Sequence, residues 1–311
     1  MIDLDLRSSV LRPAFRPRID GRQTSQEQLI VTNRPIPLVA GWEPFPGYRL
    51  TKPLGRGGWS EVWEARAPEG GSCALKFMPC DPGLAPSREI RALQALRPIK
   101  HPNILETRNI WSCPGYIVIV MELCDGSLLD LLEVYLREMD EPMSQDHVCY
   151  FLHQAAEAID FLNSRQHIID GQRMAVRHCD VKPGNLLVHG SMLKLADFSL
   201  AVPTITTMYH HRRDGTPLYC GPEVFQGWLS DRTDQYALAI SYHQLRTGLF
   251  PFPSPPKTVE RDYVRPAPDL SAVTPREREV LMRALSPVPQ NRWGSCTEMI
   301  ERLEQCCAAA V

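Results

Sequence analysis

The sequence predicts an α+β protein of two lobes, a small β-rich lobe followed by a larger helical lobe, with a cleft between them. Two patterns support this prediction: short strand-like runs fill the chain from Tyr48 to about residue 123, and amphipathic helical segments fill most of the remainder. No internal repeat is present. A chain of 311 residues is also long enough to build two packed lobes.

The β-rich part follows an N-terminal extension. Residues 1–45 contain scattered prolines and no sustained period, so we expect a flexible or draped extension and not a domain. The glycine-rich turn at 67–72 predicts a hairpin. Residues 87–97 carry an apolar helical stripe that Pro98 ends. Strands are expected at 48–55, 61–67, 73–79, 104–111 and 116–123.

The helical part begins after Gly126, where the hydrophobic pattern changes to an amphipathic helical period. The proline-rich segment 250–256 predicts an irregular link, because proline lacks a backbone donor and fixes φ. Helices are expected at 127–136, 146–165, 232–248, 274–286 and 295–307.

Composition excludes several classes of function. The chain is 43% hydrophobic and 23% charged, with a formal net charge of −2, which gives no support for nucleic-acid binding or for electrostatic membrane binding. The start lacks the apolar segment of a secretory signal, and the longest apolar stretch, Tyr116 to Met121, is too short to cross a bilayer. We therefore expect a cytoplasmic protein.

The ten cysteines show no CxxC pair and no zinc-ligand spacing. Several of them lie in apolar runs, as buried free thiols do. The prediction is reduced structural cysteines.

A glycine-rich loop at 54–62 lies between the first two expected strands. Glycines allow a backbone turn to approach phosphates with its amides exposed. A strand on each side argues against a dinucleotide-binding fingerprint, and the missing Gly-Lys-Ser/Thr excludes a P-loop. Taken alone, a glycine-rich hairpin of this kind is more often a simple tight turn than a nucleotide-binding loop.

Lys76 lies in an apolar strand, and a lysine that points inward there needs a partner. Glu89 is the acidic residue of the expected helix at 87–97. A Lys76–Glu89 pair would direct the ammonium at phosphate oxygens. Taken singly, a strand lysine usually lies on the solvent face, and the alternative for Glu89 is an ordinary solvated helix charge.

The densest group of polar residues lies at 176–187, followed by a strand that ends at Asp197. Asp180 is suited to orient a hydroxyl and accept its proton. Lys182 is suited to neutralise a transferring phosphoryl group, while the oxygens of Asn185 and Asp197 suit magnesium.

In this order and spacing, the motifs resemble those of eukaryotic-like (Hanks-type) Ser/Thr protein kinases, and within them the bacterial branch. The resemblance runs from Leu54 to Arg292. It implies a bilobal protein-kinase-like fold at 46–311, with an N-lobe at about 46–124, a C-lobe at about 125–311 and ATP in the cleft. It also implies transfer of the γ-phosphoryl group of Mg-ATP to hydroxyls of protein substrates, and it allows autophosphorylation.

The resemblance assigns ATP-binding roles along the chain. Lys76, paired with Glu89, would hold the α- and β-phosphates. Met121 resembles the gatekeeper, and Glu122 to Cys124 resemble the hinge that bonds adenine. The remaining residues expected to cover ATP or enclose its base are Leu54, Gly55, Gly57, Val62, Ala74 and Leu187.

The resemblance also assigns the catalytic roles. Asp180 would be the catalytic base, and Asn185 and Asp197 would bind magnesium. Thr216 would steady the base and Lys182, and Lys182 itself favours Ser/Thr over Tyr as the acceptor.

Two further residue roles follow from the resemblance. Glu223 is expected to pair with Arg292, and Asp234 is expected to anchor the backbone of the catalytic loop.

Four positions depart from the family pattern: Ser60 and Gly221, which should matter little, and Cys179 and Ser199. Cys179 replaces the arginine that receives the activation-loop phosphate in the family. The hypothesis is a kinase that does not depend on activation-loop phosphorylation, although Arg212 or Arg213 could receive a phosphate instead. Replacing Thr204, Thr206, Thr207 and Tyr209 together by alanine or phenylalanine should then leave activity nearly unchanged.

Two other functions stay open. One is a pseudokinase that acts as a nucleotide-binding scaffold, in which Cys179 and Ser199 mark relaxed catalytic demands. The other is a small-molecule kinase, which the peptide-binding segment at 215–224 disfavours. Metal-dependent transfer separates the first alternative from an active kinase, and the acceptor separates the second.

Overall fold

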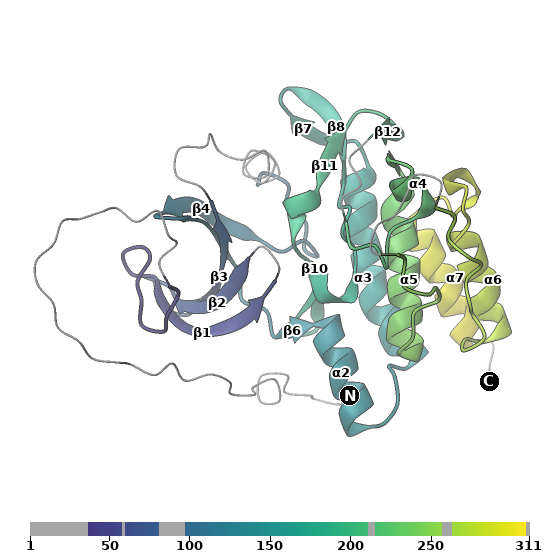
Figure 1. The fold of residues 1–311 in the computed structure, drawn as a ribbon, viewed down its shortest axis with the longest axis horizontal. Coiled ribbons are helices and arrows are strands. Elements are labelled where there is room, and N and C mark those ends of the chain that lie inside the picture. The colour runs from purple at the N-terminus through teal and green to yellow at the C-terminus, as the bar shows by residue number, and fades with distance from the viewer. Residues whose placement is uncertain (1–36, 58–59, 81–96, 211–214, 257–262, 309–311) are drawn as a thin grey trace, which may run out of the picture. The chain divides into compact units, whose positions relative to one another are not determined.

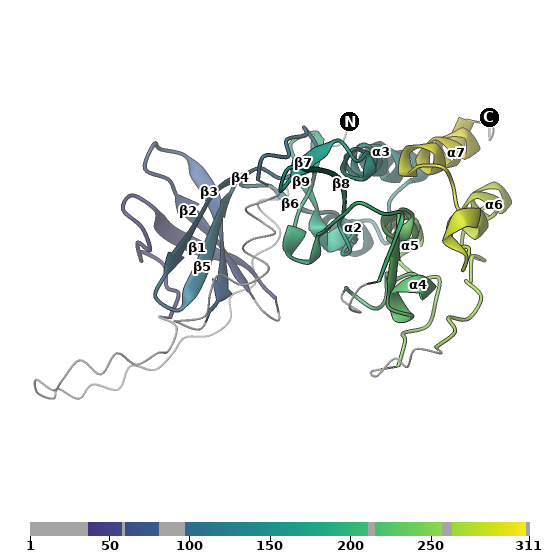
Figure 2. The same cartoon turned by 90° about the horizontal axis from the view of Figure 1, so that it is seen from above.

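The computed structural model describes residues 37–57, 60–80, 97–210, 215–256 and 263–308. These residues form two compact units, which we describe one at a time (Figures 1 and 2). The first comprises the described residues up to 80 together with 107–123, and the second comprises 97–106 and the described residues from 124 onward.

The first unit is an antiparallel five-stranded sheet in the order β1-β2-β3-β5-β4. One face carries a hydrophobic core that includes Trp63, Leu75, Phe77 and Val118. These residues alternate with others along their strands, as the period of two in a half-buried sheet requires. The strands are β1 (Arg49–Arg56), β2 (Glu61–Arg66), β3 (Ser72–Pro79), β4 (Thr107–Cys113) and β5 (Tyr116–Met121).

The described end of the N-terminal extension lies along this sheet. The amide of Gly41 donates to the Leu50 carbonyl at 2.8 Å, and the Leu50 amide donates to the Trp42 carbonyl at 2.9 Å. Leu38 and Trp42 pack against the hydrophobic core. The Phe45 ring lies 4.1 Å from that of Trp111. Residues 38–45 are therefore packed on the first unit.

The second unit is mainly helical. Helices α3, α5 and α7 lie side by side in both ribbon views (Figures 1 and 2). Ser127 and Asp130 form a capping box at the start of α2, and Thr274 and Glu277 form one at the start of α6. The helices are α2 (Leu128–Glu138), α3 (Gln145–Asn163), α4 (Pro222–Phe225), α5 (Thr233–Thr247), α6 (Pro275–Ala284) and α7 (Cys296–Ala308).

Short strands position the loops of the second unit. One three-stranded sheet has the order β10-β9-β6, a second has the order β11-β8-β7, and β12 pairs with β13. The pairing of β11 with β8 joins Val202 to Arg177, far apart in sequence. The strands are β6 (Gly126–Ser127), β7 (His167–Ile169), β8 (Gln172–Arg177), β9 (Leu186–His189), β10 (Met192–Leu195), β11 (Val202–Thr204), β12 (Met208–His210) and β13 (Trp228–Ser230).

The structure confirms the five predicted helices of the helical part and the hairpin at 67–72. The strand expected at 104–111 begins instead at Thr107. Ile104 forms a parallel bridge with Leu195 of the second unit, because the Asn103 side chain donates to the Leu193 carbonyl and directs the chain there. The helix predicted at 87–97, with Glu89, lies outside the described residues apart from its last position.

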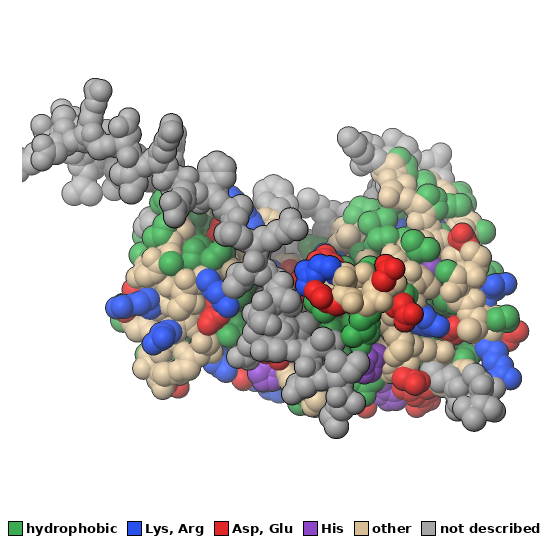
Figure 3. Space-filling model, turned by 90° about the horizontal axis from the view of Figure 1, so that it is seen from below, with side chains coloured by type: hydrophobic (Ala, Val, Ile, Leu, Met, Phe, Trp, Pro, Cys, Tyr) green, Lys and Arg blue, Asp and Glu red, His purple; other side chains and the backbone are tan. Residues whose placement is uncertain are grey.

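No helix in the described ranges is long and apolar enough to span a membrane. On the face drawn in Figure 3, basic and acidic side chains of the described residues lie interspersed and do not gather by sign. This distribution agrees with the formal net charge of −2 and shows no single-sign patch on that face.

Candidate active site

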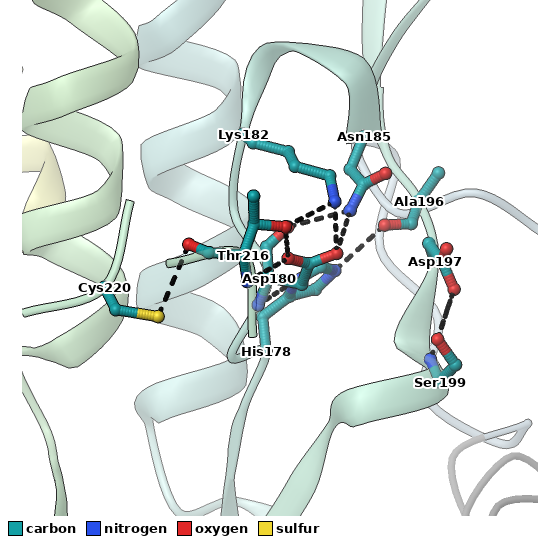
Figure 4. A network of polar contacts seen from close by, with 9 residues as sticks. All are labelled: His178, Asp180, Lys182, Asn185, Ala196, Asp197, Ser199, Thr216 and Cys220. Carbon is teal, nitrogen blue, oxygen red and sulfur yellow. Dashed lines mark hydrogen bonds and ion pairs between the residues drawn. The ribbon is translucent and has the colours of Figure 1, made fainter. Parts of the chain in front are cut away.

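The Asp180 carboxylate lies at the centre of a hydrogen-bond network in the second unit (Figure 4). Its Oδ2 accepts from Lys182 Nζ at 2.8 Å and from Asn185 Nδ2 at 2.9 Å. Its Oδ1 accepts from Thr216 Oγ1 at 2.7 Å and from the Thr216 amide at 3.2 Å. Lys182 Nζ also donates to Thr216 Oγ1 at 2.7 Å. The side-chain orientation of this carboxylate is therefore fixed from several sides.

Asp234 holds the backbone of the same loop from the first turn of α5. Its carboxylate, only 2% exposed, accepts from the amides of His178 at 2.8 Å and Cys179 at 2.9 Å. Cys179 has a φ of 67°, which few residues other than glycine adopt. A buried carboxylate with two backbone donors stabilises this turn, as the sequence predicted for Asp234.

His178 connects the loop to the strand that delivers Asp197. Its Nε2 donates to the Ala196 carbonyl at 3.0 Å, and its Nδ1 accepts from the Asp180 amide at 3.3 Å. These partners require a neutral imidazole with its proton on Nε2. The ring also packs edge-on against Phe198 at 4.8 Å. No role was predicted for His178 from sequence, although its place two residues before Asp180 was the available signal.

Asn185 and Asp197 form an oxygen-donor set suited to a hard cation. Asn185 donates both to the Asp180 carbonyl, at 2.8 Å, and to its carboxylate, so its amide nitrogen is used and its side-chain oxygen faces away from the network (Figure 4). Asp197, at a φ of 64°, accepts from Ser199 Oγ at 2.7 Å. Two protein oxygens completed by phosphate and water are typical of magnesium sites, so these residues fit that ion. Among the described residues no cluster of three His, Cys, Asp or Glu side chains could hold a metal.

The segment 215–220 brings Thr216 to the loop. Gly215 has a φ of 127°, and a Cβ there would meet the Cys179 carbonyl oxygen and Cys220 Sγ at 3.0 Å each. At the other end, Tyr219 donates from its hydroxyl to Gln244 Oε1 at 2.5 Å. Burial raises the pKa of Tyr219 to about 12. The segment is thus fixed at both ends, and the role of Gln244 was not foreseen from sequence.

Cys179 and Cys220 lie in an apolar setting. Both pack against a small cluster of Val202, Val224 and Leu229. Burial raises the pKa of the Cys179 thiol well above its ordinary value, and burial raises that of Cys220 to about 12. Both thiols are therefore protonated and unreactive near neutral pH. All nine described cysteines are free, in agreement with the expected reduced cysteines.

The predicted pair of Glu223 and Arg292 is present. Arg292 Nη1 and Nη2 donate to the two carboxylate oxygens of Glu223 at 2.8 and 2.7 Å. Both side chains are at most 5% exposed. Such a bidentate pair fixes α4, which follows the segment 215–220.

Several predicted ATP-binding residues share one face of the first unit's sheet. The register pairs Val62 with Lys76 and Ala74 with Met121, which places these side chains opposite the face that carries the hydrophobic core. Lys76 is 8% exposed in the middle strand. Gly55 pairs with Val62 in the β1–β2 hairpin.

Of the remaining predicted ATP-binding residues, some belong to the first unit and some to the second. Leu54 is 44% exposed on β1, and the Gly57 amide donates to the Ser60 carbonyl at 2.8 Å. Glu122 belongs to the first unit, whereas Cys124 and Leu187 belong to the second. Glu89 lies outside the described residues.

Comparisons with known proteins give a consistent picture. Residues 48–305 match the family model described as the protein kinase domain. The chain is 29% identical over 299 residues to Serine/threonine-protein kinase PknF of Mycobacterium tuberculosis, covering 86% of this chain and 58% of that protein. It is 30% identical over 269 residues to CBL-interacting protein kinase 4 of Oryza sativa subsp. japonica, covering 80% and 56%.

A third relative is Serine/threonine-protein kinase 1 of Arabidopsis thaliana, 28% identical over 260 residues, with 81% of this chain and 30% of that protein covered. The chain thus spans between about a third and three fifths of the length of these relatives. Bacterial and plant proteins both occur among them, so the bacterial branch stays a prediction.

Proposed function

The chain belongs to the protein kinase family, and on this premise we propose that it is an active Ser/Thr protein kinase that transfers the γ-phosphoryl group of ATP to hydroxyls of protein substrates. The observation that carries the proposal is the Asp180 network. A carboxylate, an ammonium, a carboxamide and a hydroxyl converge there from two segments, Asp180–Asn185 and Thr216.

Asp180 would orient the acceptor hydroxyl and accept its proton. Lys182, at 2.8 Å from that carboxylate, would neutralise charge on the phosphoryl group as it moves. Thr216 bonds both groups and would keep them at a fixed distance. Most of the catalytic effect would come from positioning and charge neutralisation.

ATP and magnesium are the cofactors that the family implies. Asn185 and Asp197 would hold the magnesium ion, which would neutralise charge on the phosphates. In the first unit, Lys76 would bind the α- and β-phosphates, and we propose Glu89 as its partner. The adenine and ribose would contact the residues of the remaining set, which comprises Leu54, Gly55, Gly57, Val62, Ala74, Met121, Glu122, Cys124 and Leu187.

We also propose that activity does not require activation-loop phosphorylation. Cys179 stands where the family has a phosphate-binding arginine, and here it packs in an apolar cluster. Two stretches of the chain between Asp197 and Thr216 are held by main-chain pairing. Strand β11 pairs with β8, and strand β12 pairs with β13. Thr204, one of the candidate acceptor residues, is 4% exposed and bonded to Thr206.

One observation favours the alternative of a nucleotide-binding pseudokinase. Ser199 Oγ donates to Asp197 Oδ1 at 2.7 Å and so competes with magnesium for that oxygen. Replacing Ser199 by glycine, the residue usual in the family, would remove this competition. A pseudokinase should then gain transfer activity, whereas an active kinase should change little.

The first experiment is transfer of radiolabelled γ-phosphate to a generic basic protein and to the chain itself, with magnesium, beside Asp197→Ala and Asp180→Ala. We expect label on Ser or Thr, lost with Asp197→Ala and reduced about 10²-fold or more with Asp180→Ala. The control is Glu133→Gln, an exposed position on α2. Nucleotide binding without any transfer would support the pseudokinase instead.

The second experiment tests independence from phosphorylation. Thr204→Val, Thr206→Ala, Thr207→Ala and Tyr209→Phe are combined in one chain. We expect kcat within about twofold of the wild type, because apolar packing and strand pairing hold the segment without a phosphate. A loss of tenfold or more in the variant would contradict the proposal. Activity of the wild-type chain only when it is phosphorylated would likewise show that a phosphate is needed.

A further inference from the structure

Arg265 is a buried cation that the proposed mechanism leaves without a role. It is 7% exposed and lies in the irregular stretch before α6. Within the described part of the chain, no carboxylate lies within ion-pair distance of it. Its polar partners are main-chain carbonyls: Nη2 donates to Pro217 O at 2.6 Å, and Nη1 and Nη2 both donate to Leu218 O at 3.2 Å.

Aromatic rings complete the surroundings of this guanidinium. Its central carbon lies 4.5 Å from the centre of the Phe252 ring and 5.4 Å from that of Phe225. Cation–π contacts of this kind offset part of the cost of burying a charge. The Nε atom is buried without a hydrogen-bond partner. A neutral apolar residue would avoid this cost, so the arginine is not explained by packing alone.

The two carbonyls belong to the segment that carries Thr216. Within this segment the Tyr219 amide donates to the Thr216 carbonyl at 2.9 Å, which makes it a closed turn. Thr216 then bonds Asp180 and Lys182 from the start of the turn. A displacement of the Pro217 and Leu218 carbonyls would therefore be transmitted to Thr216 through one rigid turn.

Resting on the proposed kinase function, we propose that Arg265 is a positioning residue for phosphoryl transfer: its planar guanidinium fixes the Pro217 and Leu218 carbonyls and thereby sets the position of Thr216 against Asp180 and Lys182. The fork geometry matters, because two carbonyls are bonded at once while the flat group lies against aromatic rings. Arg265 contacts neither reacting group, so it acts only through the segment.

The kinetic test combines Arg265→Met with Thr216→Val. Met retains the apolar stem and removes the fork. We expect Arg265→Met to lower kcat by about tenfold or more, with KM for ATP within about twofold of the wild type. In a chain that already carries Thr216→Val, the same change should lower kcat by less than about twofold, since the path to Asp180 is already broken. If Arg265→Met lowered kcat by the same factor with and without Thr216→Val, the proposal would be overturned.

Amide hydrogen exchange tests the same contact without needing activity. Arg265→Met should raise the exchange rates of the Thr216 and Tyr219 amides by about tenfold or more, with the amides of α3 unchanged. Unchanged exchange in this turn would overturn the proposal. If the wild-type chain transfers no phosphate, the kinase function fails, while the exchange result still decides whether Arg265 holds the turn at 216–219.

Two further variants guard against a merely structural effect. Arg283→Met removes another cation–π contact, 3.9 Å above Trp293, and should leave both readouts at wild-type values. Arg265→Lys keeps the charge but lacks the planar fork. Its kcat and its amide protection at Thr216 and Tyr219 should lie between those of Arg265→Met and the wild type. Should Arg265→Met fail to fold, Arg265→Gln replaces it in both measurements, with the same two criteria.

Discussion

Tyr219 and Cys220 are neighbouring ionisable residues whose protonation is set by burial. Tyr219 has its pKa raised from 10.0 to about 12, and Cys220 from 9.0 to about 12, in each case mainly because burial disfavours the charged form. In the unfolded chain both groups lose their protons near their ordinary pKa values of 10.0 and 9.0. The folded state therefore binds more protons than the unfolded state between about pH 9 and 12.

This difference predicts a pH dependence of stability. When the unfolded state binds fewer protons, the free energy of unfolding falls as pH rises, so the stability present below pH 9 should be lost progressively toward pH 12. Urea unfolding at pH 8 to 11 would measure it. Between pH 9 and 11, the decrease in the free energy of unfolding should be smaller by about 1 kcal/mol in Tyr219→Phe than in the wild type.

The matched control for that measurement is Tyr150→Phe, which removes a hydroxyl from a ring that is 49% exposed. If the Tyr219→Phe curve ran parallel to the wild-type curve over the whole range, the hydroxyl of Tyr219 would not be the group responsible.

Between elements, the buried pair of Glu223 and Arg292 links α4 to the chain before α7. Thr233 also donates to Glu223, at 3.1 Å, and Arg292 donates to the Arg232 carbonyl at 3.0 Å. The ring of Tyr236 lies 4.6 Å from the Arg292 guanidinium carbon. Each charge is therefore compensated from several directions, and removal of either leaves the other buried and unpaired.

Glu223→Gln is expected to lower the free energy of unfolding by about 3 kcal/mol or more, the usual cost of breaking a buried ion pair. The comparison is Glu106→Gln at the Lys100–Glu106 pair, whose side chains are 59% and 50% exposed, respectively. Exposed pairs contribute about 0–1 kcal/mol. Equal effects of the two substitutions on urea unfolding would contradict this account.

Elements with a strong local pattern were predictable, and elements defined by pairing were not. The helix α3 has a clear apolar stripe and a Ser144 cap, so its position follows from sequence. The three-residue strands β11 and β12 carry no period long enough to detect. Their existence depends on partners, β8 and β13, that packing brings alongside.

At the scale of the whole chain, the structure predicts that residues 38–45 stabilise the first unit. Trp42 packs on the sheet core with its ring 6.0 Å from that of Phe77. A chain that begins at residue 46 would lose this contact and three main-chain hydrogen bonds that join residues 41–45 to Tyr48 and Leu50. It should therefore unfold at lower urea concentration than a chain that begins at residue 37.

The expected loss is on the order of 2 kcal/mol, as for removing one large half-buried aromatic residue. Trp42→Ala in the full-length chain should reproduce most of it. If the chain from residue 46 matched the chain from residue 37 in stability, residues 38–45 would have no part in the folded unit.

By itself, the sequence determined the order of most elements and, through its motifs, the family. Helical periods, glycine turns and the spacing from Asp180 to Asn185 are local, so they can be read from neighbouring residues. The network around Asp180 was foreseen only because its motifs resemble those of a known family.

Only the tertiary structure decided which distant residues meet. The family resemblance had predicted that Thr216 and Asp234 meet the loop of Asp180, whereas Arg265 carries no motif and was not predicted. Arg265 reaches the segment that holds Thr216 because two aromatic rings and two carbonyls are packed around it. Contacts of this kind depend on how whole elements pack, and the linear pattern of residues does not contain that information.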